Sequence, residues 1–164
     1  MIRSITRQKT EEEILQLLDG LGRVFIVGCG TCVTLTHTGG EPEVEAMKER
    51  LSGKGKLVTG HVVLPVACDN LTGEALKEYG QQIVQANVLL IMTCAFGVQT
   101  VARQLKKMVV PALDTLFIGK ETGIGQFDEI CIQCGTCVLG ETGGICPVTS
   151  CHKGLVNGPC GGHQ

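Results

Sequence analysis

Three short apolar runs in the first hundred residues each precede a segment with helical spacing. The runs span residues 23–28 (RVFIVG), 56–66 and 87–93 (NVLLIMT), and the last of them is uniformly apolar, as is typical of a strand buried on both faces. The segments 41–55, 71–86 and 95–107 that follow them space their apolar residues as helices do. Strands that alternate with helices predict right-handed βαβ units. We therefore expect an α/β fold: an open, mostly parallel sheet with flanking helices.

The residues before and after this alternation of strands and helices suggest that the chain has two parts. Thr10 and Glu13 have the spacing of a capping box and predict a leading helix, and residues 112–118 predict a fourth strand. After Gly119 the chain is rich in Gly, Cys and Thr without useful periodicity. We expect an α/β body at 1–119, holding a first cluster site, and an irregular Cys-rich metal-binding tail at 120–164. The 164 residues are enough for one core and a small appendage.

Charge and hydropathy exclude some partners. The chain has 14 basic and 16 acidic residues, a net charge of −2 and no basic cluster, so nucleic acid is not an expected partner. The first residues lack an apolar signal region, and no apolar run approaches the roughly 20 residues of a membrane span. We expect a cytoplasmic protein. In a reducing cytosol, its ten cysteines are metal ligands rather than a disulfide framework.

Four of these cysteines follow the predicted strands. Cys29 and Cys32 come after the first strand, Cys68 after the second and Cys94 after the third. The loops that leave the carboxyl ends of parallel strands lie along one edge of the sheet, where such folds bind ligands. We expect the four thiols to meet there. Helix N-termini at the same edge would stabilise thiolates.

Other interpretations of these residues remain open. Cys68 and Cys94 could be buried small apolar residues, as an isolated cysteine usually is. The segment GCGTC could be a thioredoxin-like CxxC redox pair formed by Cys29 and Cys32. Gly28-x-Gly30 also begins a dinucleotide fingerprint, but the third glycine position is Val33, and an incomplete motif is a weak signal.

Six cysteines lie in the tail. Cys131, Cys134 and Cys137 stand at two successive CxxC spacings, as in the turn of a bacterial ferredoxin that presents three thiolates to one cluster. The fourth ligand would come from Cys146, Cys151 or Cys160, and the spacing leaves this choice open. Zinc is the alternative metal, because tetrahedral thiolate sites use the same pairs and can organise a segment without a core.

The four histidines are scattered, and we expect them to be surface or packing residues: His37, His61, His152 and His163. His152 is the one histidine that we keep as a candidate ligand, because it adjoins Cys151. The aromatic content of 3% without tryptophan leaves little stacking surface for a flavin on this chain.

A family resemblance adds to this interpretation. The stretch TGGICPVTSCHKGLVNGPCGG, with the preceding CxxCGxC, resembles the C-terminal domain found in some methylenetetrahydrofolate reductases. It also resembles the MetV-type small subunit that partners a flavin-bearing reductase in acetogenic bacteria. The upstream stretch GCGTCVTLTHTGGEPEV is similar to the first cysteine loop of the same subunit.

The resemblance implies an iron–sulfur electron-transfer subunit of one-carbon metabolism, in the Wood–Ljungdahl pathway. It implies two [4Fe–4S] clusters, the first held by Cys29, Cys32, Cys68 and Cys94 and the second by four of the six tail cysteines. The chain would pass electrons to the flavin, FMN or FAD, of a TIM-barrel methylenetetrahydrofolate reductase subunit that reduces methylene-tetrahydrofolate to methyl-tetrahydrofolate. It would be non-catalytic and inactive alone, with ferredoxin or another electron-donating subunit as a further partner.

Two alternatives come from other classes of protein. Related C-terminal domains have been described as zinc-binding, so zinc is the alternative metal at the C-terminal site. The chain could then be a structural zinc-binding or interaction module of a one-carbon enzyme complex. It could also be a CxxC thiol oxidoreductase acting through Cys29 and Cys32.

Overall fold

The computed structural model describes residues 1–151, 153 and 160. Its contacts divide the chain into two units. The body unit is Ser4–Leu116, and the tail unit is Met1–Arg3 with Phe117–Gln164.

The body unit contains a four-stranded parallel sheet, as predicted. Its strands lie in the order β3-β2-β4-β5, and their bounds are β2 (Arg23–Cys29), β3 (Leu57–Leu64), β4 (Val88–Met92) and β5 (Val109–Pro111). Every residue of β4 is buried, as the uniformly apolar run predicts for a strand covered on both faces. The α/β fold class is therefore confirmed.

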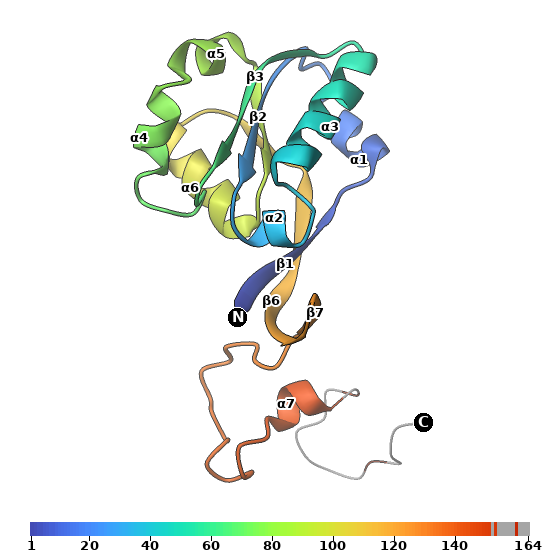
Figure 1. Ribbon diagram of the computed structural model, residues 1–164, viewed down its shortest axis with the longest axis vertical. Coiled ribbons are helices and arrows are strands. Elements are labelled where there is room, and N and C mark those ends of the chain that lie inside the picture. Colours follow the sequence, from blue (N-terminus) through green and yellow to red (C-terminus); the bar gives the residue numbers. More distant parts are fainter. Residues whose placement is uncertain (152, 154–159, 161–164) are drawn as a thin grey trace. The chain divides into compact units, whose positions relative to one another are not determined.

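Helices cover both faces of this sheet (Figure 1). On one face lie α1 (Glu11–Leu17) and α3 (Glu41–Gly53); on the other lie α4 (Thr72–Lys77), α5 (Gly80–Gln85) and α6 (Ala95–Leu105). The short α2 (Cys32–Leu35) directly follows the loop after β2. Because successive strand side chains point to opposite faces, β2 sends Val24 and Ile26 to the α1/α3 core and Phe25 and Val27 to the α4/α6 core.

The local signals of three helices are confirmed. The Thr10 side chain accepts from the Glu13 amide while the Glu13 carboxylate accepts from the Thr10 amide, which closes the predicted capping box of α1. The apolar positions predicted for α3 are its buried residues, Val44, Met47 and Leu51. Helix α6 lies within its predicted segment. The single helix expected at 71–86 is two helices, α4 and α5, which are separated at Glu78 and Tyr79. The Tyr79 ring packs on Phe25, with ring centroids 5.9 Å apart.

The fourth strand of the parallel sheet was predicted in the wrong place. It is β5, and the predicted residues 112–118 instead fall largely in β6 (Leu113–Gly123), which belongs to a second sheet of order β1-β6-β7. The sequence analysis also missed β1 (Ile2–Gln8), because its inward-facing residues are Ser4 and Thr6, both buried but polar.

The tail unit is largely irregular. The end of β6 pairs antiparallel with β7 (Gln126–Asp128), and α7 (Pro147–Ser150) is a single turn. After Gly119, no residue that the structure describes is buried. The described part of the tail therefore has no apolar core of its own. In the described part of the whole chain, no helix is both long and apolar enough to cross a membrane.

Candidate functional site

The four body cysteines lie at the carboxyl ends of three neighbouring strands. Cys29 is the last residue of β2, and Cys32 opens α2 three residues later. Cys68 lies in the loop between β3 and α4, and Cys94 is the residue before α6, two after the end of β4. Because β3, β2 and β4 are adjacent and parallel, these loops leave the same edge of the sheet. This is the edge at which open α/β sheets bind ligands.

The three other body thiols affect the pKa of Cys68. Cys68 is exposed at the surface, but the groups around its thiol partly desolvate it, and this raises the pKa of the thiol above its ordinary value. The neighbouring thiols raise it further, in the order Cys94, Cys29 and Cys32. Like charges gathered in this way disfavour thiolates unless a cation is bound among them. The arrangement is therefore suited to a positively charged metal centre.

The thiols differ in burial. Cys29 and Cys94 are 6% and 8% exposed, Cys32 is intermediate, and Cys68 is exposed. The Cys29 Sγ accepts a hydrogen bond from the Ala67 amide at 3.4 Å and lies 3.1 Å from the Thr31 hydroxyl. Two thiols thus form the inner side of the site, and Cys68 forms its outer side. Hydrogen bonds to sulfur are among the features that tune iron–sulfur centres.

The spacing of the body thiols allows a test of the group they could hold. Among the described residues, one group of three ligand atoms lies within 4.8 Å of one another, and it contains no cysteine. Thiolates around one tetrahedral zinc, each about 2.3 Å from the ion, lie roughly 3.8 Å apart. No three of the body thiols, all of which the structure describes, lie within 4.8 Å of one another, whereas the thiolates around one zinc would. Four thiolates that each bind a different iron suit a [4Fe–4S] cluster, so this donor set fits one.

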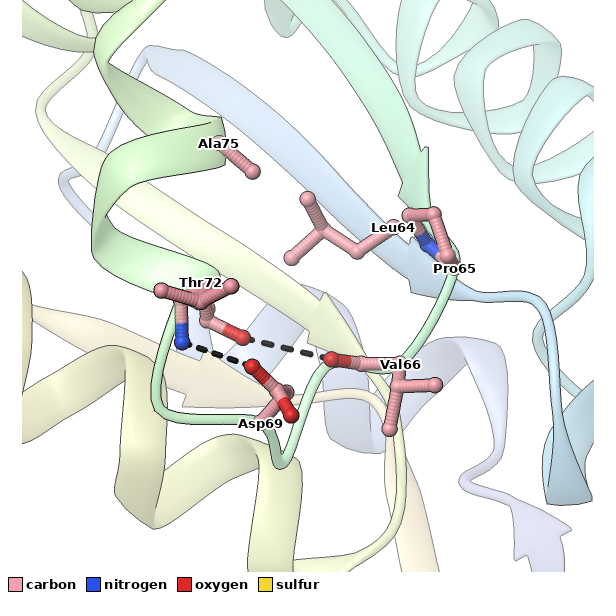
Figure 2. A pocket seen from close by; sticks show the side chains of 7 residues that line it. Leu64, Pro65, Val66, Asp69, Thr72 and Ala75 are labelled. Atoms are coloured by element: carbon pink, nitrogen blue, oxygen red, sulfur yellow. Dashed lines mark hydrogen bonds between the residues drawn. The ribbon is translucent and has the colours of Figure 1, made fainter.

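The loop that carries Cys68 is held by hydrogen bonds on both sides of that residue. The Thr72 amide donates to the Asp69 carbonyl at 3.2 Å, and the Thr72 hydroxyl donates to the Val66 carbonyl at 3.3 Å (Figure 2). The same loop encloses a mostly apolar hollow of about 320 Å³, lined by Leu64, Pro65, Val66, Asp69, Leu71, Thr72 and Ala75. The position of Cys68 is therefore fixed by the loop around it.

Cys68 is reached from outside through a second hollow. This hollow has a volume of about 340 Å³ and is lined by Cys68 and by one side of α6: Phe96, Gln99, Thr100 and Arg103. Arg103 is the cationic residue in the last turn of that helix. The exposed edge of the thiol site thus has an aromatic and a cationic side chain beside it.

In the tail, four of the six cysteines share one hollow. Cys131, Cys134, Cys137 and Cys146 line a space of about 120 Å³. Gln133 and Gly135 have φ angles of 52° and 78°, so the CIQCGTC segment turns sharply between its thiols. Hydrogen bonds from the Thr149 hydroxyl, the Thr149 amide and the Val148 amide lower the pKa of Cys146, which favours its thiolate. Cys151 and Cys160 are not among the residues that line this hollow.

Two other interpretations of the first cysteine loop lose support. Cys29 is buried, whereas the reactive thiol of a redox pair is partly exposed. Val33 is buried in the core, where a dinucleotide fingerprint requires a glycine for close approach. The geometry favours a shared thiol site over both.

One group of possible ligands was missed by the sequence analysis. Glu41, Glu45 and His61 bring one ligand atom each within 4.8 Å of one another. The spacing of the two glutamates, four residues apart on a predicted helix, is a signal for that pair. Nothing local in the sequence connects them with His61.

Fold and site together define an α/β protein that gathers four thiols at the ligand-binding edge of its sheet and carries a separate thiol-rich segment. Residues 110–164 match the model of the family described as methylene-tetrahydrofolate reductase C terminal. The match includes all six tail cysteines and begins after the four body cysteines. The description connects this segment with an oxidoreductase of one-carbon metabolism. No curated protein and no solved structure matches the chain.

Proposed function

We propose that the chain is a MetV-type iron–sulfur electron-transfer subunit of a methylenetetrahydrofolate reductase complex. It passes electrons to the FMN or FAD of a TIM-barrel partner, which reduces methylene-tetrahydrofolate to methyl-tetrahydrofolate. Ferredoxin or another donor subunit supplies the electrons. The observation that carries this proposal is the position of four cysteines in three loops that leave adjacent parallel strands at one edge of the sheet. The family match of the tail supports the choice of enzyme.

The ligands divide between the two units. Cys29, Cys32, Cys68 and Cys94 would hold one [4Fe–4S] cluster, and the thiols that line the tail hollow would hold the second. Cys151 and Cys160 would then be spare. When bound, such clusters transfer single electrons. Because thiolate ligands need a reducing compartment, we place the protein in the cytoplasm.

The residues around the body thiols have distinct tasks. Cys29 and Cys94 hold the inner side of the site, where burial keeps water away. The Ala67 amide donates to the Cys29 sulfur and stabilises negative charge on it. Cys68 is exposed, so the hollow that it lines with Phe96 and Arg103 is the side on which a redox partner can approach most closely.

Metal analysis of anaerobically purified protein tests the proposal. Two clusters require about eight irons and a similar amount of acid-labile sulfide per chain. Cys29→Ser should lose about half of both. Cys160→Ser, which does not alter the residues that line the tail hollow, should lose neither. Zinc without iron would support the structural zinc module instead. Zinc at the tail alone, with four irons, would restrict the iron–sulfur assignment to the body.

A further inference from the structure

A second group of metal ligands lies on the body unit. Glu41 and Glu45 are one turn apart at the start of α3, and His61 is on β3. The His61 Nε2 lies 2.8 Å from a Glu45 carboxylate oxygen and 3.8 Å from one of Glu41. The three ligand atoms all lie within 4.8 Å of one another. We propose that Glu41, Glu45 and His61 form a binding site for a divalent first-row cation, independent of the thiol sites.

A bulge in β3 brings His61 to this position. Val24 pairs with Val58, but Phe25 pairs with Gly60, so Thr59 is an extra residue in the strand. The insertion changes which face the later residues point to. His61 pairs with Ile26, whose side chain belongs to the core under α1 and α3. His61 therefore faces α3, where the side chains of Glu41 and Glu45 lie above one another.

The charges around the group favour a cation. Lys48 contacts the second oxygen of Glu45 at 3.1 Å, and its hydrogen bond lowers the pKa of that carboxyl, with the charge of His61 as a smaller cause. His61 is the ion-pair partner that the described structure gives Glu41. Two converging carboxylates repel each other, and a bound dication would relieve this more completely than Lys48 does.

The ligand types indicate which cations the site could take. It offers two carboxylate oxygens and one imidazole nitrogen, and first-row divalent ions bind such atoms at about 2.0–2.2 Å. The Glu41 and Glu45 side chains are 64% and 43% exposed, so water can complete the coordination. Carboxylates and water suit Mn²⁺, while imidazole also suits Zn²⁺. Mn²⁺ is the better probe, because the thiols of this chain would compete for zinc.

The experiment is a titration of the anaerobically purified full chain with Mn²⁺, followed by the EPR signal of the free ion. We expect a dissociation constant below about 1 mM. Glu41→Gln and His61→Ala should each weaken binding at least tenfold. Glu49→Gln is the matched control, because it removes the same charge from an exposed position of α3 outside the group. Lys48→Gln should tighten binding, since it frees a Glu45 oxygen.

A second measurement locates the ion. Substoichiometric Mn²⁺ should broaden the amide NMR signals of residues 41, 43–45 and 61 before those of the cysteine loops. Far-UV circular dichroism shows whether each variant folds, and Glu41→Gln, at a mostly exposed side chain, keeps the test valid if His61→Ala does not fold. The proposal is overturned if the unmodified chain holds no Mn²⁺ at millimolar concentration. It is also overturned if Glu49→Gln weakens binding as much as Glu41→Gln, or if the broadening centres elsewhere.

Discussion

The Cys29 amide donates a hydrogen bond to the Gly39 carbonyl oxygen, with an N···O distance of 3.1 Å. This bond joins the end of β2 to the loop before α3. Gly39 is also tightly enclosed, since a Cβ there would lie 2.0 Å from the carbonyl oxygen of Met92 at the end of β4. Gly39, which accepts the hydrogen bond from the Cys29 amide, therefore has no room for a side chain. Its tight packing fixes the backbone around Cys29.

Gly39→Ala should destabilise the body and displace the loop beside Cys29. The clash is with backbone atoms, which cannot turn away, so we expect a loss of at least about 2 kcal/mol in the free energy of unfolding. Urea denaturation would measure it. Gly53→Ala is the control: it also adds one methyl group, at the end of α3 where no atom lies within 4 Å, and should change stability by less than about 1 kcal/mol. Equal midpoints for the two variants would contradict the prediction.

Cys94→Ser should remove a ligand of the thiol site without unfolding the body. The side chain lies at the edge of the sheet, while the apolar residues of β2 and β4 supply the core, so we expect about half of the iron to be lost with little change in circular dichroism. Iron analysis and thermal unfolding of the same preparation would show this. Full iron content in the variant would remove Cys94 from the ligand set.

Asp114 should make the body sensitive to acid. A hydrogen bond from Lys9, and more weakly one from Arg7, lowers the pKa of Asp114 in the folded chain. A lowered folded pKa stabilises the fold above the unfolded pKa, and this contribution is lost as the pH falls through the folded pKa. Asp114→Asn should cost about 0.5–1 kcal/mol at pH 7, and this cost should shrink steadily as the pH falls below the ordinary carboxyl pKa of 3.8.

Urea titrations at several pH values would check this prediction. Asp19→Asn provides the control, because the described structure gives the Asp19 side chain no ion pair. A difference between Asp114→Asn and the unmodified chain that did not shrink in acid would exclude the ion pair as its cause.

Much of the fold could be predicted because local signals agreed with the tertiary structure. The capping box at Thr10 and the buried run of β4 needed no distant partner to be recognised. The failures depend on distant contacts. The inward-facing residues of strand β1 are Ser4 and Thr6, so its sequence lacks the alternation of apolar and polar residues that would reveal a strand. The Thr6 hydroxyl lies 2.6 Å from that of Thr38, a contact with a distant residue. The three residues of β5 were too short a run to separate from the strand that follows.

The candidate sites show the same division. Parallel strands end at one edge, so the order of elements alone was enough to expect the body thiols together. The sequence gives no sign that Cys29 is buried and Cys68 exposed, because burial depends on the helices that pack around them. His61 was interpreted as a surface or packing residue, because the bulge that turns it toward α3 exists only in the paired strands.

Cys134→Ser should loosen the tail. No described residue after Gly119 is buried, so metal binding would be the main source of folding free energy there. We expect limited proteolysis to cut within residues 120–164 of the variant at least several times faster than in the unmodified chain, while the body stays intact. Cys160→Ser should resist cleavage as the unmodified chain does. Identical cleavage of the Cys134 variant and the unmodified chain would mean that metal does not organise this segment.

The last prediction concerns catalysis. Reduction of methylene-tetrahydrofolate needs two electrons delivered together as a hydride, which a reduced flavin supplies and a one-electron carrier does not. An aromatic content of 3% gives this chain little surface on which to stack a flavin. The purified chain should therefore form no methyl-tetrahydrofolate with substrate and a low-potential donor, and activity should appear when a flavin-carrying reductase subunit is added.

Anaerobic mixing experiments with each component omitted in turn would test this, with flavin bleaching and methyl-tetrahydrofolate formation as the two signals. Cys29→Ser and Cys134→Ser should each slow flavin bleaching, because each removes one ligand from one of the proposed clusters. Folate binding by the partner should not change, since neither residue lies on the partner. Glu49→Gln, at an exposed position of α3 outside both sets of thiols, should bleach the flavin at the rate of the unmodified chain. Product formation by this chain alone, or unchanged bleaching after both thiol sites are removed, would assign it a different role.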